Sequence, residues 1–466
     1  MSYAGASLDP LLTELGLSRS DSGGSVRILG DDPVVGGPHR LGAASAVALA
    51  AHGTAVAAIW RQRGGRGQDV TIDIVEAVHG LNTGQFVRQN GYAIDSMVLM
   101  ASPTYGLHPT ADERQVLTVT MPLRQREGIL NLLGCGHSFD AVRAKLAAWN
   151  SVEFEDACGE RGLAGCMVRT VEEWNQHPQA QWLASKPVID IRKIGESAPE
   201  PFSPGERPLS GMRVLNVAHV LAGPILCRTL ASQGADVLRI TSHLVPDDFP
   251  VILDTGFGQR SAYLHLDYPE DRTRLEALIR EADIFVQSYS PGSLAKRGFS
   301  PERIAELRPG IIYAEVSCYG GGPWAARAGY DPNAQAVTGI SVTEGSLADP
   351  RSVPTGLLAD LTTSYLGAAG VLTALLRRAK SGGSYQVRLS LTRTCMWAQS
   401  IGLIEPERRL PSDHPLPLPT PTLLKMHSSF GELTYMAPPA RFSRTPAYWT
   451  QPPEPPGASR PEWLPR

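Results

Sequence analysis

One carboxylate, Asp360, stands in the otherwise apolar stretch "LLADLTTSY", at the expected first turn of a long helix. A carboxylate at this position faces the positive end of the helix dipole, which stabilises a negative charge on the residue or beside it. Such a group can attack an electrophilic carbonyl, or it can simply cap the backbone amides of its helix. The residues alone leave both interpretations open.

A second group of polar residues follows the glycine-rich loop "YGGGPWAARAG", where Tyr330 and Asp331 stand in "AGYDPNAQ". They could belong to a binding site or to a buried turn. His177 in "HPQ" is expected in a turn, and Cys318 in "VSCYGG" has no evident histidine partner, so we expect a structural thiol. The six cysteines are scattered without a CxxC pair, which favours reduced thiols over disulfides or a metal site.

The elements that position these residues alternate between strand and helix over 209–400. The run "MRVLNV" is a strand, Pro224 suits the first turn of a helix, Gly234 ends that helix, and "ADVLRI" is the next strand. Further strands are expected in "DIFVQSY" and "GIIYAEVS". This alternation predicts an α/β fold, with a doubly wound parallel sheet of Rossmann-like type that is covered by helices. No GxGxxG follows the first strand, which argues against a nicotinamide enzyme.

The composition excludes several classes of function. The chain has 466 residues, 42% hydrophobic and 19% charged, with a net charge of -3, as in an ordinary globular protein of two or three domains. This charge predicts no nucleic-acid partner and no membrane-surface partner. An apolar run of about 18 residues and a signal-peptide pattern are both missing from the sequence, so we expect a cytoplasmic protein.

Composition also divides the chain. Residues 1–193 mix helix with some strand, 194–208 read as a linker, 209–404 alternate strand and helix, and 405–466 form a proline-rich arm. The arm carries 15 prolines, which predicts no long helix or central strand in it. We expect the arm to wrap over another surface in an extended form rather than to form a core.

An internal repeat supports this division. Residues 53–78 align without gaps over 370–395, each an apolar helix with basic residues at its end, a glycine turn and a strand. The same offset of 317 places Ala43 opposite Asp360. A duplicated chain of this kind would therefore carry one active site.

Four segments together resemble class III CoA-transferases, the CaiB–BaiF family that includes formyl-CoA transferase, carnitine CoA-transferase and α-methylacyl-CoA racemase. They are "PLSGMRVLNVAHVLAGPILCRTLASQGADVLRI", "DIFVQSYSPGSLAKRGFSPERIAELRPGIIYAEVSCYG", "AGYDPNAQAVTG" and "VPTGLLADLTTSYLGAAGVLTALLRRAKSGG". The segments "GGRGQDVTIDIVEAV", "CMVRTVEEWNQHPQAQWLAS" and "SSFGELTYMAPPARFSRTPAYW" resemble later parts of the same family. The resemblance implies that residues 1–104 are a partial copy of the family's post-catalytic helix and strand region, that 105–193 are a small α+β domain and that 209–404 are the catalytic domain that binds coenzyme A. It also implies an interlocked architecture, with the chain either a monomer that mimics a dimer or a homodimer.

The resemblance also assigns roles. Asp360 matches the family's nucleophile, which would attack an acyl-CoA thioester and pass CoA to an acceptor carboxylic acid, with no metal. Backbone amides near the helix start could stabilise the oxyanions. The implied contacts to coenzyme A are Leu221, Ala222, Lys296, Arg327, Ala328, Gly329 and Tyr330. The chain departs from the family in "QSYSPG", where Ser288 and Ser290 replace the usual residues.

Three functions remain open at this point. The first is a CoA-transferase that uses Asp360. The second is an acyl-CoA racemase or isomerase, although the family's racemases carry a histidine where this chain has Tyr330. The third is a non-catalytic protein that binds coenzyme A.

Overall fold

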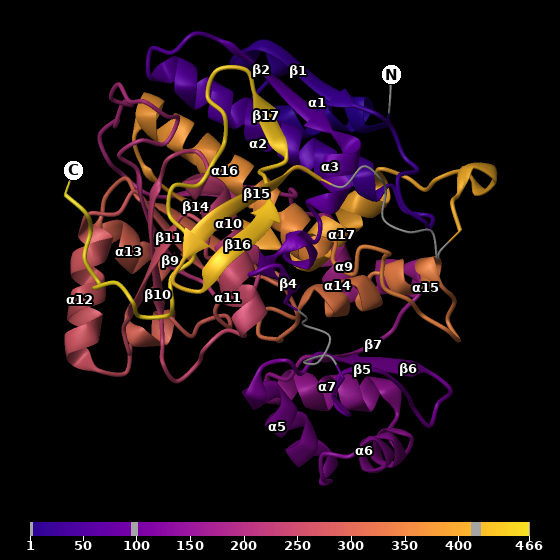
Figure 1. Cartoon of the computed structure of the whole chain (residues 1–466). Coiled ribbons are helices and arrows are strands. Elements are labelled where there is room, and N and C mark those ends of the chain that lie inside the picture. Colours follow the sequence, from indigo (N-terminus) through magenta and orange to yellow (C-terminus); the bar gives the residue numbers. More distant parts are fainter. Residues whose placement is uncertain (1–2, 95–100, 412–420, 466) are drawn as a thin grey trace.

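The largest layer of the computed structural model, which describes residues 3–94, 101–411 and 421–465, is a seven-stranded sheet (Figure 1). Its order is β11-β10-β9-β12-β13-β14-β8, and only the β14–β8 pair is antiparallel. The strands are β8 (Asp190–Gly195), β9 (Arg213–Val217), β10 (Asp236–Thr241), β11 (Gln259–Tyr263), β12 (Ile284–Gln287), β13 (Ile312–Ser317) and β14 (Ser384–Ser390). The parallel-rich sheet confirms the predicted α/β class.

Helices cover both faces of this sheet. Successive side chains of each strand point to opposite faces, and apolar residues on both faces need to be buried. Val214 packs in the core formed with α10 (Ala222–Ala231) and α16 (Ala359–Ser381). Its neighbour Leu215 packs in a second core with α12 (Pro269–Arg280) and α13 (Pro301–Leu307). The chain leaves β9 and β12, at the centre of the sheet, in opposite directions, so the loops after these strands border a crevice of the kind that binds nucleotides.

The N-terminal part of the chain builds a smaller sheet of β1 (Gly23–Leu29), β2 (Gln68–Asp73) and β17 (Ala440–Phe442) beside α1 (Tyr3–Leu15), α2 (Leu41–Gln62) and α3 (Ile74–His79). Helix α2 packs along α16. A shift of 317 residues places β2 on β14 and the start of α3 on the start of α17 (Leu391–Ser400). The elements therefore repeat in register, and their common origin stays a prediction.

A small domain lies apart from these layers (Figure 1). It combines β5 (Gly106–Pro109), β6 (Gln115–Thr118) and β7 (Gly165–Met167) with α5 (Leu123–Leu133), α6 (Phe139–Leu146) and α7 (Ser151–Arg161). Val116, Ile129 and Phe154 belong to its separate core. Helices α8 (Val171–Gln176) and α9 (Pro178–Ala184) lead back to β8. The boundary predicted at residue 193 thus falls inside a strand of the large sheet.

The C-terminal arm contains a hairpin, β15 (Leu423–Ser428) and β16 (Gly431–Met436), followed by β17. Strand β16 lies between β15 and β3 (Arg88–Gln89), with β4 (Tyr92–Ala93) outermost. The prediction of no central strand in the arm is therefore wrong, because its prolines flank 423–436 and none lies within it. Trp449 of the arm is buried in the main core, so the arm packs against the rest of the molecule at this residue. Residues 412–420 lie outside the described part of the arm.

Two helices, α2 and α16, are long and apolar enough to cross a membrane by length and composition. Their most apolar windows are 100% and 94% buried inside the protein. Burial against each other and against the two sheets accounts for this apolar character.

Candidate active site

The start of α16 is fixed by Asp331, the first residue of α14 (Asp331–Val337). One oxygen of its carboxylate accepts hydrogen bonds from the backbone amides of Leu358, at 3.0 Å, and Asp360, at 2.8 Å. The other oxygen accepts one from the side chain of Gln335, at 2.6 Å. These two amides are therefore occupied, so the prediction that amides at the helix start stabilise an oxyanion is wrong for Leu358 and Asp360.

Asp360 itself is 7% exposed, whereas Asp331 is fully buried. Nothing in the described part of the chain hydrogen-bonds to the Asp360 carboxylate. Burial, and then repulsion by Asp331, raises the pKa of Asp360 well above its ordinary value. The helix dipole was expected to stabilise the charge, but the Asp331 carboxylate already neutralises that end of the helix. The closed site therefore favours the protonated acid.

Two of the predicted loops lie against the first turns of α16. The hydroxyl of Ser364, one turn after Asp360, donates to the carbonyl oxygen of Ala222 at 2.7 Å, which brings the start of α10 against α16. Leu221 is the residue before that helix. Tyr330 directly precedes Asp331, and burial raises the pKa of its phenol to about 12, so the phenol stays neutral at physiological pH.

Gly329 has a steric reason to be glycine. A Cβ atom there would lie 2.7 Å from the sulfur of Cys318 and 2.9 Å from the ring of Tyr319. Burial raises the pKa of the Cys318 thiol, and its sulfur donates to the carbonyl oxygen of Tyr330 at 3.6 Å. Cys318 is thus a structural thiol, as predicted, that packs beneath the loop bearing Ala328, Gly329 and Tyr330.

The loop after β9 carries a network that sequence reasoning missed. Val220 has a positive φ of 62°, an uncommon conformation for a β-branched residue that often marks a functional loop. Its amide donates to Asp247 at 3.1 Å, and Asp247 also pairs with Arg239. The ring of His219 lies 3.5 Å from the same carboxylate.

The departure from the family motif in "QSYSPG" supports this loop. The hydroxyl of Ser288 accepts from the His219 amide at 2.9 Å and donates to the His219 carbonyl at 3.1 Å. The hydroxyl of Tyr289 lies 2.7 Å from the Nε2 atom of His219. The altered segment therefore fixes the loop across the crevice between β9 and β12. The sequence offered one signal for this contact. The loops after β9 and β12 both follow strands that a doubly wound sheet places next to each other at its centre.

The predicted cations are not gathered in one place. Arg327 donates to Asp156 of the small domain at 2.6 Å and lies 4.5 Å above the ring of Trp324. It is therefore engaged with protein rather than open to a ligand. Lys296 is exposed on the loop after β12, and none of the contacts of the described residues joins it to Asp360. Its neighbour Arg297 pairs with Asp267 at 2.9 Å.

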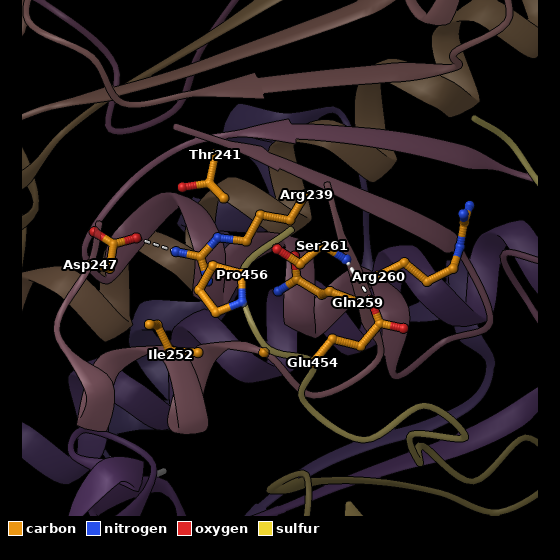
Figure 2. Close-up of a pocket in the computed structure, with 10 residues that line it drawn as sticks. Arg239, Thr241, Asp247, Ile252, Gln259, Arg260, Ser261, Glu454 and Pro456 are labelled. Carbon is orange, nitrogen blue, oxygen red and sulfur yellow. Dashed lines mark hydrogen bonds and ion pairs between the residues drawn. The ribbon is translucent and has the colours of Figure 1, made fainter. Parts of the chain in front are cut away.

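Figure 2 shows a small cavity beside this network, beyond β10 and β11. Arg239 and Asp247 line it, together with Glu454 and Pro456 of the C-terminal arm. Its volume of about 10 Å³ is room for at most one water molecule. Glu454 and Pro456 therefore close this cavity to anything larger than a water molecule.

The remaining candidates are structural. His177 caps α9, where its Nδ1 atom accepts from the Gln179 amide at 3.1 Å, and its ring stacks on Trp174. All six cysteines are free and five are buried. Among the described residues, no group of three or more His, Cys, Asp or Glu could hold a metal ion.

Comparison with known proteins places these features in a family. Residues 209–415 match the sequence profile described as CoA-transferase family III. The chain contains a CoA-transferase family III domain. This domain carries Asp360, Asp331, Tyr330 and the loop after β9. The family resemblance seen in the sequence is confirmed for residues 209–415.

Relatives of the family III domain are known by name. An acyl-CoA transferase of Gibberella moniliformis is 32% identical over 60% of this chain and 53% of its own. The acetyl-coenzyme A transferase nodX of Hypoxylon pulicicidum is 37% identical over 56% of this chain and 47% of its own. A crystal structure of a CaiB/BaiF family protein from Brucella suis is 26% identical, covers 50% of this chain and 67% of its own, and has a TM-score of 0.39. The chain spans about half the length of the curated relatives it matches.

Proposed function

We propose that this chain transfers coenzyme A from an acyl-CoA thioester to a carboxylic acid, through a covalent intermediate on Asp360. The observation that supports this most is the placement of Asp360. Its backbone is fixed by Asp331, while no described residue hydrogen-bonds to its carboxylate. A carboxylate presented in this way, inside a CoA-transferase family III domain, suits a nucleophile better than a helix cap, because Asp331 already caps the helix.

The proposed reaction is a series of acyl transfers between carboxylates and the thiolate of coenzyme A. An oxygen of the Asp360 carboxylate attacks the thioester carbonyl, which forms a mixed anhydride and releases CoA thiolate. The thiolate then attacks the Asp360 carbonyl carbon, which releases the first carboxylic acid and leaves CoA on Asp360 as a thioester. The acceptor carboxylate repeats the two steps in reverse order and leaves as its CoA ester. The covalent intermediates on Asp360 thus divide one difficult exchange into several easier steps.

Proton state controls the first step. Only the ionised carboxylate is nucleophilic, and burial beside Asp331 raises the pKa of Asp360. We therefore expect the rate to rise with pH through that raised pKa. The neutral phenol of Tyr330 is our candidate donor to the oxyanion, in place of the occupied amides.

Coenzyme A would lie in the crevice between the loops after β9 and β12. Leu221 and Ala222 would approach it through backbone and shape, and the exposed Lys296 would contact its phosphates. Ala328, Gly329 and Tyr330 would border the reacting end. Arg327 could join only after its ion pair with Asp156 opens.

A transfer assay with two matched variants tests the proposal. Asp360→Asn removes the nucleophile, and Asp32→Asn changes a second buried carboxylate that also accepts amides at a helix start, those of Gly42 and Ala43 of α2. We expect Asp360→Asn to lose roughly a thousandfold or more in kcat, and Asp32→Asn to stay within about threefold of the parent. Transfer by Asp360→Asn at the parental rate would contradict the proposal.

A further inference from the structure

Val220, in the loop between β9 and α10, has a backbone conformation that valine rarely adopts. Its φ is 62°, in the left-handed region, where a β-branched side chain is crowded. Among the described residues, two other non-glycine residues have a positive φ, Asn90 and Glu113, and both lie in the turn of a β-hairpin. Val220 instead leads into a helix, so contacts with the rest of the protein must hold it in this conformation.

The contact that holds Val220 comes from Asp247, in the loop after β10. One oxygen of the Asp247 carboxylate accepts a hydrogen bond from the Val220 amide at 3.1 Å, and the other oxygen pairs with Arg239. The side chain of Asp247 is 8% exposed, and the guanidinium of Arg239 is itself fixed by the hydroxyl of Thr255 at 3.1 Å. A hydrogen bond to a buried carboxylate is stronger than one to a neutral acceptor. Asp247 therefore stabilises the left-handed conformation of Val220 by accepting its amide.

A short chain of contacts joins this loop to the candidate nucleophile. Val220 is followed by Leu221 and by Ala222, the first residue of α10. The hydroxyl of Ser364 lies 2.7 Å from the carbonyl oxygen of Ala222 and 2.7 Å from the carbonyl oxygen of Asp360. The backbone conformation of Val220 therefore determines how the start of α10 meets the turn of α16 that carries Asp360.

The residues around Val220 leave the loop little room to adjust. The hydroxyl of Ser288 binds both the amide and the carbonyl of His219, at 2.9 Å and 3.1 Å. A Cβ atom at Gly223 would lie 2.4 Å from the Cβ atom of Ala218, so the end of β9 and the start of α10 are in close contact. Since His219 is fixed before Val220, a change in the φ of Val220 moves the residues that follow it.

We propose that Asp247 is a positioning residue for the transfer reaction, which keeps Val220 left-handed so that Leu221 and Ala222 lie correctly against the acyl-CoA at Asp360. This rests on the proposed function, in which these two residues contact coenzyme A. Asp247 acts through the backbone of Val220 and not on the substrate. Without the carboxylate, the Val220 amide loses its acceptor and the valine relaxes to an ordinary conformation, which moves the start of α10 relative to Asp360. A displacement of about 1 Å near a reacting centre can cost on the order of a hundredfold in rate.

Hydrogen exchange and transfer kinetics of matched variants test this role. Asp254 is the control, since its side chain is 7% exposed and pairs with an arginine as that of Asp247 does, but its hydrogen bonds go to Arg228 and Thr83 rather than to the loop after β9. Asp247→Ala should speed amide exchange in the peptide that covers 218–222 by about tenfold and lower kcat by about tenfold or more. Asp254→Ala should leave both within about threefold of the parent.

A second substitution supplies a rescue that a general loss of stability would not show. Glycine adopts a positive φ readily, so Val220→Gly removes the need for the Asp247 acceptor. Added to Asp247→Ala, it should raise kcat by about fivefold or more over that of Asp247→Ala alone. If Asp247→Ala does not fold, Asp247→Asn takes its place. Its amide oxygen is a weaker acceptor than a carboxylate, so exchange in 218–222 should be about threefold faster than in the parent, with the same rescue of kcat.

Two results would overturn the assignment. Equal losses of kcat in Asp247→Ala and Asp254→Ala would make Asp247 an ordinary member of a buried ion pair. A kcat that Val220→Gly does not raise would show that Asp247 does not act through the conformation of Val220. Exchange in 218–222 requires no turnover, so it tests the hold on the loop even if the parent protein shows no transfer, a result that would refute the proposed function alone.

Discussion

Replacing Asp331 by alanine separates the stability of the α16 start from the chemistry of Asp360. The change leaves two backbone amides, those of Leu358 and Asp360, without their buried acceptor. Each orphaned buried donor costs about 1–3 kcal/mol, and removal of a buried charge offsets part of this. We expect Asp331→Ala to lower the free energy of unfolding by about 2–4 kcal/mol in urea titrations at neutral pH.

The matched control is Asp32→Ala. Asp32 accepts the amides of Gly42, at 3.2 Å, and Ala43, at 2.8 Å, at the start of α2, so the stability loss should be of similar size. Only Asp331→Ala frees the backbone of Asp360, and it should therefore lower kcat by about tenfold or more, while Asp32→Ala keeps it. Equal kcat losses in the two variants, or a stability loss below about 1 kcal/mol in Asp331→Ala, would refute the positioning role.

Three further outcomes are expected. Because the pKa of Asp360 is raised in the folded state, the native state loses stability as pH rises through that value. Asp360→Asn should therefore be more stable than the parent at pH 8, and the difference in free energy of unfolding should narrow toward pH 4. Urea titrations of both proteins at the two pH values measure this difference. Tyr289→Phe removes the hydroxyl that contacts His219 and should weaken coenzyme A binding a few-fold in calorimetry, without a large change in melting temperature. Arg63→Ala removes donors to the carbonyl oxygens of Ser203, Pro208 and Ser210 and should speed proteolysis of that linker, whereas Arg66→Ala should not.

Local patterns made the fold of the family III domain predictable. Apolar runs bounded by turn residues specify the strands one by one, and βαβ connections leave few sheet topologies. The start of α16 near Asp360 followed in the same way. The hairpin at 423–436 was missed because proline density was averaged over the whole arm, although that stretch contains no proline.

The rest of the site depends on contacts between distant residues, which spacing along the chain does not reveal. Burial of Asp360, and then repulsion by Asp331, raises the pKa of Asp360, which is the opposite of the effect expected from the helix dipole. Arg327 pairs with Asp156, a residue of another domain.

The central claim concerns a covalent bond to Asp360, and mass spectrometry of the digested protein after incubation with an acyl-CoA tests it directly. Hydroxylamine present during turnover should convert the Asp360 side chain into a hydroxamate, in the peptide that contains "LLADLTTSY" and in no other. Continued turnover with an unmodified Asp360, or a hydroxamate at a different carboxylate, would contradict the account.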